Sequence, residues 1–224
     1  MMAHSLSSQP MDLLQEGAVI LGVQLPPPAS EQFRRYLEEL RRWNARVNLT
    51  GLKTERDIIV KHFLDSLAVL PFLGDAASLA DLGSGAGFPG LALKLVRPEM
   101  ALTLVEARAK KAAFLEYLAS LLQLEGVEVA QAHLTPALAR KWGPRFDAVT
   151  SRAAFPLARF LELAAPLLLP GGRALALKGP NLAAGEMDAA REKCGSLGLG
   201  PLELHRYELP FNEEPRILVV ARHL

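Results

Sequence analysis

Residues 80–90 constrain the fold more than any other stretch of the chain. They read Ala-Asp-Leu-Gly-Ser-Gly-Ala-Gly-Phe-Pro-Gly, follow a short apolar run and precede another at residues 91–96. A strand, a glycine-rich turn and a helix start, in this order, form a place where α/β proteins hold cofactors. Glycine lets the backbone turn sharply and approach a ligand. Pro89 suits the first position of a helix because proline lacks an N–H.

The type of cofactor is indicated by the carboxylate beside these glycines. The spacing Gly85-x-Gly87-x-x-Gly90 also occurs in dinucleotide-binding enzymes. Asp81 argues against that interpretation, because it would repel a pyrophosphate, whereas it suits the positive charge of S-adenosyl-L-methionine. The spacing Asp81-x-Gly83-x-Gly85-x-Gly87 resembles the first motif of Rossmann-like methyltransferases. A dinucleotide enzyme and a glycine-rich turn without a ligand stay open as alternatives.

From residue 77 onward the predicted elements alternate between strand and helix. Strands are expected at residues 78–82, 101–106, 127–131, 146–150, 173–178, 201–208 and 215–223. Helices are expected at residues 89–97, 108–123, 136–141, 156–169 and 181–195. Such alternation predicts an α/β fold, with helices on both faces of a parallel sheet. With an antiparallel final pair, this gives the seven-stranded, mostly parallel sheet of Rossmann-like class I S-adenosylmethionine-dependent methyltransferases.

The segment before this domain has a different pattern. Residues 1–10 are predicted to form a flexible tail, residues 11–76 a small N-terminal helical cap, and residues 77–224 the methyltransferase domain, in one compact unit with the cap. A short helix is expected at residues 11–22. Ser30 is expected to cap the next helix, and Thr54 a third that runs to about residue 70. The second helix has one apolar face, formed by Phe33, Tyr36, Leu37, Leu40 and Trp43.

Composition excludes several classes of protein. The 224 residues include 25 basic and 24 acidic side chains, so nucleic-acid binding has to come from a local patch. The single cysteine, Cys194, excludes an internal disulfide and fits a reducing cytoplasm. The sequence shows neither metal-ligand spacing nor a run long enough to span a membrane. We therefore predict a cytoplasmic protein without a metal or membrane partner, and expect a monomer.

In a parallel sheet, ligands bind at the carboxyl ends of the strands. The first strand supplies the turn with Asp81, Gly83, Ser84, Gly85 and Gly87. The second ends at Glu106, placed to take ribose hydroxyls or else to cap the following helix. The third leads to Leu134 and Thr135, where backbone groups suit an adenine edge, although Thr135 also fits as a helix cap. The fourth and fifth strands lead to Arg152 and Lys178.

A local basic excess lies upstream of the glycine turn. Residues 30–62 contain eight basic and five acidic side chains. The candidate RNA-binding residues in this stretch are Arg34, Arg41, Arg42, Arg46, Asn48, Lys61 and His62. The alternative is a solvated helix face for the arginines and a structural role for the histidine. Lys61, His62 and Asp65 lie within about one helical turn and are expected to share a surface.

The end of the fourth strand narrows the methyl acceptor. Enzymes that methylate exocyclic amines carry Asn or Asp, two prolines and an aromatic residue there, whereas this chain has Thr-Ser-Arg-Ala-Ala-Phe-Pro at residues 150–156. Cytosine C5 methylation requires a cysteine nucleophile near the cofactor, and Cys194 lies in a late helix. A small-molecule acceptor stays open on these residues alone.

The motifs together resemble the 16S ribosomal RNA guanine-N7 methyltransferases, the glucose-inhibited division protein B family. Besides the glycine turn with its Phe-Pro-Gly ending, the matching motifs are Trp43-Asn44-x-x-x-Asn48-Leu49-Thr50, Lys61-His62-x-x-Asp65-Ser66-Leu67, Phe146-Asp147-x-Val149-x-Ser151-Arg152-Ala153, and Pro170-Gly171-Gly172 through Leu177-Lys178-Gly179. The resemblance covers about residues 30–220. It implies methyl transfer from S-adenosyl-L-methionine to a guanine N7 of 16S ribosomal RNA or the small ribosomal subunit. In the family's usual rRNA numbering this is guanine 527.

The resemblance also implies roles for individual residues. Gly83, Phe88, Leu134, Thr135 and Arg152 match the family's cofactor-contact positions. The family usually has Arg-Ala-Glu-Glu after the third strand, where this chain has His133-Leu134-Thr135-Pro136, so only backbone contacts are expected to carry over there.

The implied reaction needs little chemistry from the protein. Guanine N7 carries a lone pair and no proton, so we expect no general base, and catalysis reduces to positioning, which can contribute roughly 7–11 kcal/mol. Arg152 and Lys178 are the candidate catalytic residues, holding the cofactor carboxylate, a phosphate or guanine O6. Two alternatives stay open: an NAD-dependent or small-molecule α/β enzyme, and an RNA-binding or ribosome-assembly module with a cofactor fold.

Overall fold

The computed structural model describes residues 9–183 and 185–224. Its strands are β1 (Ser78–Leu82), β2 (Ala101–Glu106), β3 (Val127–Gln131), β4 (Phe146–Arg152), β5 (Leu168–Lys178), β6 (Glu203–Glu208) and β7 (Pro215–Arg222). Its longer helices are α1 (Pro10–Ile20), α2 (Ala29–Val47), α6 (Gly90–Val96), α7 (Ala109–Leu121), α8 (Pro136–Trp142), α9 (Leu157–Ala164) and α10 (Glu186–Cys194). Shorter helical segments are α3 (Glu55–Ile58), η1 (Ile59–Leu64), α4 (Asp65–Leu67), α5 (Leu70–Leu73), η2 (Ala165–Leu167) and η3 (Gly195–Leu197).

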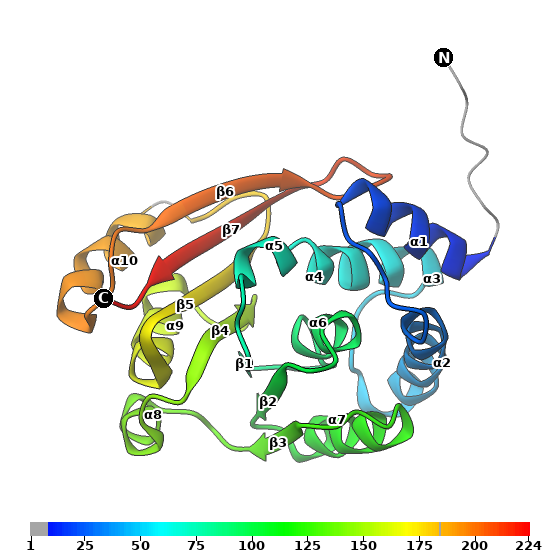
Figure 1. The fold of residues 1–224 in the computed structure, drawn as a ribbon, viewed down its shortest axis with the longest axis horizontal. Coiled ribbons are helices and arrows are strands. Elements are labelled where there is room, and N and C mark those ends of the chain that lie inside the picture. The colour runs from blue at the N-terminus through cyan, green and yellow to red at the C-terminus, as the bar shows by residue number, and fades with distance from the viewer. Residues whose placement is uncertain (1–8, 184) are drawn as a thin grey trace.

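The seven strands form one sheet in the order β3-β2-β1-β4-β5-β7-β6 (Figure 1). Strands β1 to β5 pair in parallel, and β7 pairs antiparallel with both β5 and β6. The predicted fold class is therefore confirmed. The order reverses direction between β1 and β4, which places the carboxyl ends of β1, β2 and β4 around a common crevice. This is the position where open α/β sheets bind ligands.

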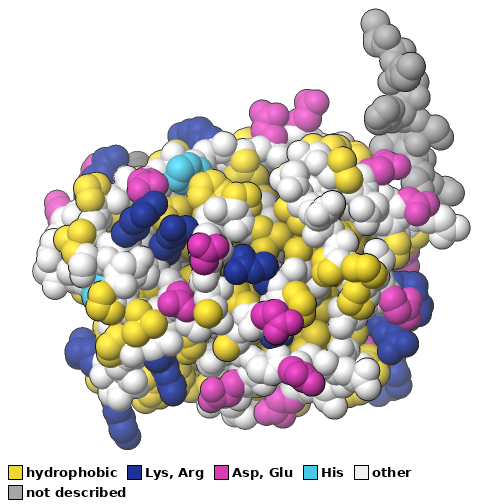
Figure 2. Space-filling view, viewed as in Figure 1, with side chains coloured by type: hydrophobic (Ala, Val, Ile, Leu, Met, Phe, Trp, Pro, Cys, Tyr) yellow, Lys and Arg dark blue, Asp and Glu magenta, His cyan; other side chains and the backbone are white. Residues whose placement is uncertain are grey.

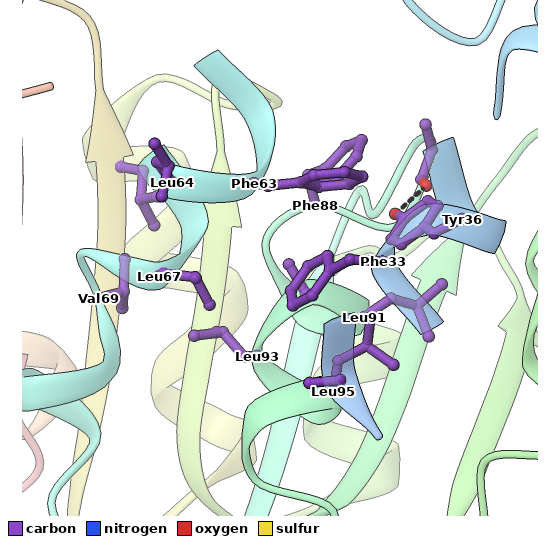
Figure 3. Close-up of a cluster of buried hydrophobic side chains, with 14 of the residues drawn as sticks. Phe33, Tyr36, Phe63, Leu64, Leu67, Val69, Phe88, Leu91, Leu93 and Leu95 are labelled. Carbon is purple, nitrogen blue, oxygen red and sulfur yellow. Dashed lines mark hydrogen bonds between the residues drawn. The ribbon is translucent and has the colours of Figure 1, made fainter. Parts of the chain in front are cut away.

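Each face of the sheet has its own apolar core. The larger core joins the N-terminal helices to α6 and α7, and the other lies beneath α8, α9 and α10, as the two helical layers of Figure 1 show. In the larger core the rings of Phe33, Tyr36, Phe63 and Phe88 meet (Figure 3), with centroids 4.9 Å apart for Phe33 and Phe63. The N-terminal helices therefore contribute part of the core against which the glycine turn rests.

Two predicted boundaries near the N-terminus change. The predicted tail lies outside the described residues up to residue 8, and Pro10 already begins α1. Helix α2 begins at Ala29, so Ser30 lies inside the helix and makes no cap, because Pro28 takes the N-cap position. At the other end of the helix, Asn48 ends α2 in the left-handed conformation with φ 53°, a conformation that asparagine tolerates.

The third predicted helix is divided. Thr54 caps it as predicted, since its side chain accepts a hydrogen bond from the backbone N–H of Asp57. The next six residues, η1, form a wider π-helical turn before the α-helix resumes at Asp65. No sequence pattern indicated this turn, although such turns are frequent at functional sites. It carries both Lys61 and His62.

The remaining elements match their predicted ranges within two residues, apart from α9, β5 and α10. The helix predicted at residues 156–169 ends as α9 at Ala164 and is followed by the short turn η2. Strand β4 extends to Arg152, so this side chain lies at the strand end itself. Strand β5 begins earlier than expected, at Leu168, and α10 begins later, at Glu186. Among the helices of the described residues, none combines the length and the hydropathy needed to cross a bilayer.

Candidate functional site

A cavity of about 720 Å³ lies at the carboxyl ends of β1, β2 and β4. We call it the first cavity. Seven of the predicted cofactor-binding positions line it: Gly83, Ser84, Gly85, Phe88, Glu106, Leu134 and Arg152. Three others, Asp81, Gly87 and Thr135, lie behind its wall. The structure thus brings together residues that are 69 positions apart in the chain around one concave space.

The backbone of the glycine turn is already hydrogen-bonded within the protein. The N–H groups of Gly83 and Ser84 donate to the carbonyl of Val105, and those of Gly87 and Phe88 donate to the carbonyl of Ser84. The first N–H of α6 donates to Asp81, as described below. A pyrophosphate-binding loop needs such groups to point at the ligand. The geometry of the turn therefore disfavours the dinucleotide alternative.

Asp81 supports the turn from beneath and does not line the cavity. Its side chain is fully buried, and Oδ2 accepts a hydrogen bond of 2.9 Å from the N–H of Gly90. Burial raises its pKa from 3.8 to about 7, while the Gly90 hydrogen bond and the charge of Arg152 oppose that rise. The expectation of a direct cofactor contact is thus replaced by a structural one: Asp81 fixes the turn and the start of α6.

Gly87 and Thr135 also support the site from behind its wall. A Cβ at Gly87, with φ +99°, would lie 2.6 Å from the hydroxyl of Tyr36, so glycine is required there by packing. The hydroxyl of Thr135 accepts a hydrogen bond from the N–H of Leu138 and caps α8, which was the alternative role predicted for it. The side chain of Ser84 donates to the carbonyl of Asp81.

The cavity wall fits the adenosyl part of S-adenosyl-L-methionine. Glu106 accepts from the N–H of Gly85 through one carboxylate oxygen and from that of Arg108 through the other. Each oxygen keeps a second lone pair for a ribose hydroxyl. A Cβ at Gly85 would meet only one neighbouring atom, a carbonyl oxygen at 3.8 Å, so a side chain there would project into open space. The apolar side chain of Leu134 adds a surface for a base.

Phe88 organises the other end of the cavity. Its ring stacks on Tyr36 at 5.1 Å and on His62 at 4.6 Å, and the Arg152 guanidinium lies 5.0 Å from its centroid. The Tyr36 hydroxyl donates to the carbonyl of Ala86 at 2.6 Å (Figure 3, dashed line). The α2 helix therefore holds the glycine turn directly. Sequence analysis had placed Tyr36 only in the core.

Arg152 is held by the π-helical segment and α4. Its guanidinium donates to the carbonyl of Lys61 at 2.9 Å and to Oδ2 of Asp65 at 3.3 Å, and contacts Nδ1 of His62 at 2.9 Å. Nδ1 also lies 3.1 Å from the carbonyl of Lys61, which only accepts. Because a guanidinium has only donors, the shorter contact with Arg152 assigns Nδ1 as an acceptor and His62 as neutral, with Nε2–H donating to the Thr50 hydroxyl at 2.7 Å. Burial lowers the pKa of His62 to about 3. His62 therefore adds no positive charge to the site, and its contact with RNA stays a prediction.

A second cavity of about 660 Å³ adjoins the first. The two share a wall formed by Thr50, Gly51, His62, Arg152 and Ala153. Lys178 lines the second cavity and not the first, and its ammonium donates to Glu186 at 2.7 Å and to the carbonyl of Phe155 at 2.8 Å. Its expected grip on the cofactor carboxylate therefore has no support in this arrangement, whereas Arg152 faces both spaces.

Sequence analysis missed three residues at this second space: Glu214 and Arg216, which line it, and Tyr207, which contacts a lining residue. Tyr207 donates to Oδ1 of Asp65 at 2.8 Å, and Arg216 lies 3.7 Å from the same oxygen. Glu214 forms ion pairs with Lys61 and Arg216. All three come from the β6–β7 hairpin, and a Glu-Pro-Arg sequence before a strand gave no signal of a site. Lys61, His62 and Asp65 do share a surface, as predicted.

The basic patch of α2 is largely paired with carboxylates. Arg34 pairs with Glu31 and Glu38, Arg41 with Glu55, and Arg42 with Glu39. Arg46 and Asn48 are exposed near the end of the helix. Figure 2 shows basic and acidic side chains interspersed over one face of the molecule, including its right edge over α2. The patch therefore offers less free positive charge than its sequence suggested, and its contact with RNA stays a prediction.

The described residues contain no group of three or more His, Cys, Asp or Glu side chains placed to hold a metal ion.

The chain matches a known sequence family over residues 29–213, described as GidB: rRNA small subunit methyltransferase G. The chain belongs to the GidB family. The resemblance found from the motifs is thereby confirmed, and the dinucleotide alternative falls.

Individual relatives of the chain support the same family assignment. A ribosomal RNA small subunit methyltransferase G from Roseiflexus sp. (strain RS-1) is 44% identical over 212 residues, which are 94% of this chain and 90% of the relative. One from Geobacter sp. (strain M21) is 38% identical over 209 residues, 93% and 95% of the two chains. A solved structure of geranyl diphosphate C-methyltransferase from Streptomyces coelicolor A3(2), in complex with S-adenosyl-L-homocysteine, shares the fold with a TM-score of 0.57 and 16% identity, over 84% of this chain and 98% of that one.

Proposed function

We propose that this chain transfers a methyl group from S-adenosyl-L-methionine to N7 of a guanine in 16S ribosomal RNA, naked or within the small ribosomal subunit. Membership of the GidB family supports an S-adenosylmethionine-dependent rRNA methyltransferase. The choice of N7 goes further. It comes from the motif resemblance described above, and it is supported by the arrangement of the two adjoining cavities and by the groups at their boundary that are able to accept a proton.

The single observation that carries the proposal is the wall shared by the two cavities. The first cavity suits the adenosyl group, and the second opens beside it across Arg152, His62 and Thr50. A flat base entering the second cavity would meet the donor at this wall. The A-form major groove is too deep and narrow for a protein to read N7 in a helix, so the acceptor guanine is expected in a loop or a distorted segment.

The chemistry at this wall fits an acceptor without a proton. His62 cannot act as a base, because Nδ1 accepts from Arg152, Nε2 carries the proton that it donates to Thr50, and its pKa is about 3. Asp81 is fully buried behind the wall, so its carboxyl group cannot accept a proton from the acceptor. When N7 takes the methyl group, the bond from carbon to sulfur breaks as the bond from carbon to nitrogen forms, the positive charge passes to the purine, and no proton is released.

Arg152 is the residue best placed to position the reactants. Its side chain is 15% exposed and is fixed at three points, on Lys61, His62 and Asp65. Fixed donors in a water-poor site cost little reorganisation during a reaction. Because an arginine that forks onto both O6 and N7 would cover the nucleophile, we propose that Arg152 holds the cofactor carboxylate or O6 alone. Lys178 remains a proposed contact for a phosphate or O6 in the second cavity.

The test is transfer of label from S-adenosyl-L-methionine to 16S ribosomal RNA that lacks its own N7 modification, offered both naked and in subunits, followed by nuclease mapping. A matched transcript made with 7-deazaguanosine has a C–H group in place of N7 and is expected to accept no label. Label on the 7-deaza transcript would refute the N7 assignment. Arg152→Ala should lower turnover at saturating RNA and cofactor. Arg159→Ala, which removes a half-exposed arginine that pairs with Glu162 on α9, should not. Full turnover of Arg152→Ala would refute its proposed role.

A further inference from the structure

We propose that Lys61 and Arg216 form a binding site for one phosphodiester of the acceptor RNA, and that Glu214 occupies this site until the RNA displaces it. The inference rests on the proposed function only in taking RNA as the ligand of the second cavity. It adds a defined anion site to that cavity and assigns a competing role to a side chain of the protein itself.

The two cations are bridged by a single carboxylate. Lys61 Nζ lies 2.6 Å from Oε1 of Glu214, and Arg216 Nη2 lies 2.9 Å from Oε2 of the same side chain. All three residues line the second cavity. A phosphodiester also presents two terminal oxygens and one negative charge, and both lysine and arginine bind such groups with short, charge-assisted hydrogen bonds. Glu214 therefore stands where the two oxygens of a phosphate would be held.

The cations do not depend on Glu214 for their place. Arg216 is also held from below by Asp65, at 3.7 Å from Oδ1, and its side chain is only 14% exposed. Lys61 projects from the π-helical turn, with Asp57 at 3.8 Å as its other carboxylate. Asp65 itself is fixed by Tyr207. When Glu214 leaves, the two cations thus stay beside each other at the cavity.

Glu214 is able to leave. Its side chain is 38% exposed, and it lies on the loop that joins β6 to β7, which passes beside α1 in Figure 1. Hydrogen bonds from Lys61 and then Arg216 lower its pKa, so it stays ionised and competes as an anion. Ion pairs that reach water are weak. A phosphate of a polyanion that enters the cavity would take the place of the Glu214 carboxylate. Because both groups are negatively charged, Lys61 and Arg216 would stay neutralised.

The remaining charges of the cavity favour an anion. Four cationic side chains line it, Lys61, Arg152, Lys178 and Arg216, against two carboxylates. Asp65 is 4% exposed and remains paired with Arg152. Displacement of Glu214 leaves Asp65 as the one carboxylate that lines this space among residues 9–183 and 185–224. The same cavity also reaches the wall that it shares with the first cavity. A nucleotide suits both features, because its phosphate would bind the cations and its base would lie at the shared wall.

The test measures the affinity of the full chain for a transcript of small-subunit ribosomal RNA by filter binding over a range of KCl concentrations. Glu214→Gln removes the competing charge and is expected to tighten binding about fivefold, which is the upper range for an exposed pair. Lys61→Gln and Arg216→Gln remove the phosphate contacts and are expected to weaken binding. The salt slope of Glu214→Gln should steepen by about 0.7, as for one more phosphate contact on a single strand.

The direction of these effects separates the proposal from a purely structural ion pair. If the pair only stabilised the fold, breaking it from either side would change RNA binding in the same direction, and that result would overturn the site. Glu213→Gln is the matched control, because it makes the same change of charge one residue away, where no ion pair joins it to Lys61 or Arg216 among the described residues. An equal gain from Glu213→Gln would also overturn the site, by showing a general effect of charge.

Two further measurements complete the test. Glu214→Asp keeps the charge but shortens the side chain, so the carboxylate should reach only one cation, and the variant should tighten RNA binding less than Glu214→Gln does. Thermal unfolding checks that both variants are folded. If both are folded and neither binds RNA more tightly than the wild type, displacement of Glu214 is refuted. The methylated atom is mapped separately. Label away from N7 with the expected binding pattern would refute the proposed function and leave the phosphate site, whereas label at N7 without that pattern would refute the phosphate site alone.

Discussion

Replacing Asp81 by asparagine tests how the glycine turn is supported. The carboxyl group is fully buried, with Oδ2 bonded to the N–H of Gly90 and Oδ1 without a hydrogen-bond partner among the described residues. Its pKa rises from 3.8 to about 7 because burial disfavours the charged form. An acid with a raised pKa in the folded state stabilises the fold below pH 3.8, and that contribution is lost as the pH rises toward 7.

The size of the effect follows from the width of this pH range. Each pH unit in which only the unfolded state is ionised costs about 1.4 kcal/mol, so Asp81 should lower the free energy of unfolding by about 2 kcal/mol between pH 5.5 and pH 7, with little further change above that. Asparagine keeps the shape and the acceptor for Gly90 but cannot ionise. We therefore expect the free energy of unfolding of Asp81→Asn, relative to that of the wild type, to rise by about 2 kcal/mol between pH 5.5 and pH 8.5.

The assay is urea unfolding of both proteins at pH 5.5 and pH 8.5. Titration of all other groups is common to both, so it cancels when the free energies of unfolding are subtracted. The control is Asp188→Asn, whose carboxylate forms an exposed pair with Arg191 on α10; its difference from wild type should not change with pH. A difference between Asp81→Asn and wild type that is equal at the two pH values, or that has the opposite sign, would refute the assignment of a buried, weakly ionised Asp81.

Three further substitutions test other parts of the site. Glu106→Gln should weaken binding of S-adenosyl-L-methionine about tenfold by calorimetry, since a hydrogen bond to a charged group contributes about 1.5–3 kcal/mol; unchanged affinity would exclude a ribose contact. Tyr36→Phe leaves the buried carbonyl of Ala86 unbonded and should lower the free energy of unfolding by about 1 kcal/mol in a urea titration, with no loss as the contrary result. Asp65→Asn leaves Arg152 without its buried partner, so the free energy of unfolding should fall by about 3 kcal/mol and turnover should fall at saturating RNA; full turnover would show that Asp65 does not position Arg152.

The sequence predicted those parts of the site that follow directly from one strand end. Gly85, Glu106 and Arg152 each lie at or just after a parallel strand, and such ends meet at one edge of the sheet whatever the details of packing. The same rule correctly predicted that cofactor-side residues far apart in the chain would converge. It could not distinguish a residue that lines the cavity from one that supports it, and Asp81 and Thr135 proved to be supports.

The acceptor side could not be predicted in this way. Arg216 and Glu214 reach the second cavity because β7 inserts between β5 and β6, and because the hairpin loop passes beside the N-terminal helices. That contact depends on tertiary packing between segments about 150 residues apart. Likewise, the pairing of Lys178 with Glu186 depends on where α10 begins. The sequence pattern placed that start several residues too early.

The position of β7 has a consequence for the order in which the protein is made. All residues that line the first cavity precede residue 156, whereas the anion site needs Arg216, from a strand that must enter between two strands made earlier. A growing chain folds from its N-terminal part onward. The donor side of the reaction centre is therefore synthesised well before the anion site is complete, and a nascent chain that stops short of β7 carries the residues for the methyl donor and Lys61 without Arg216.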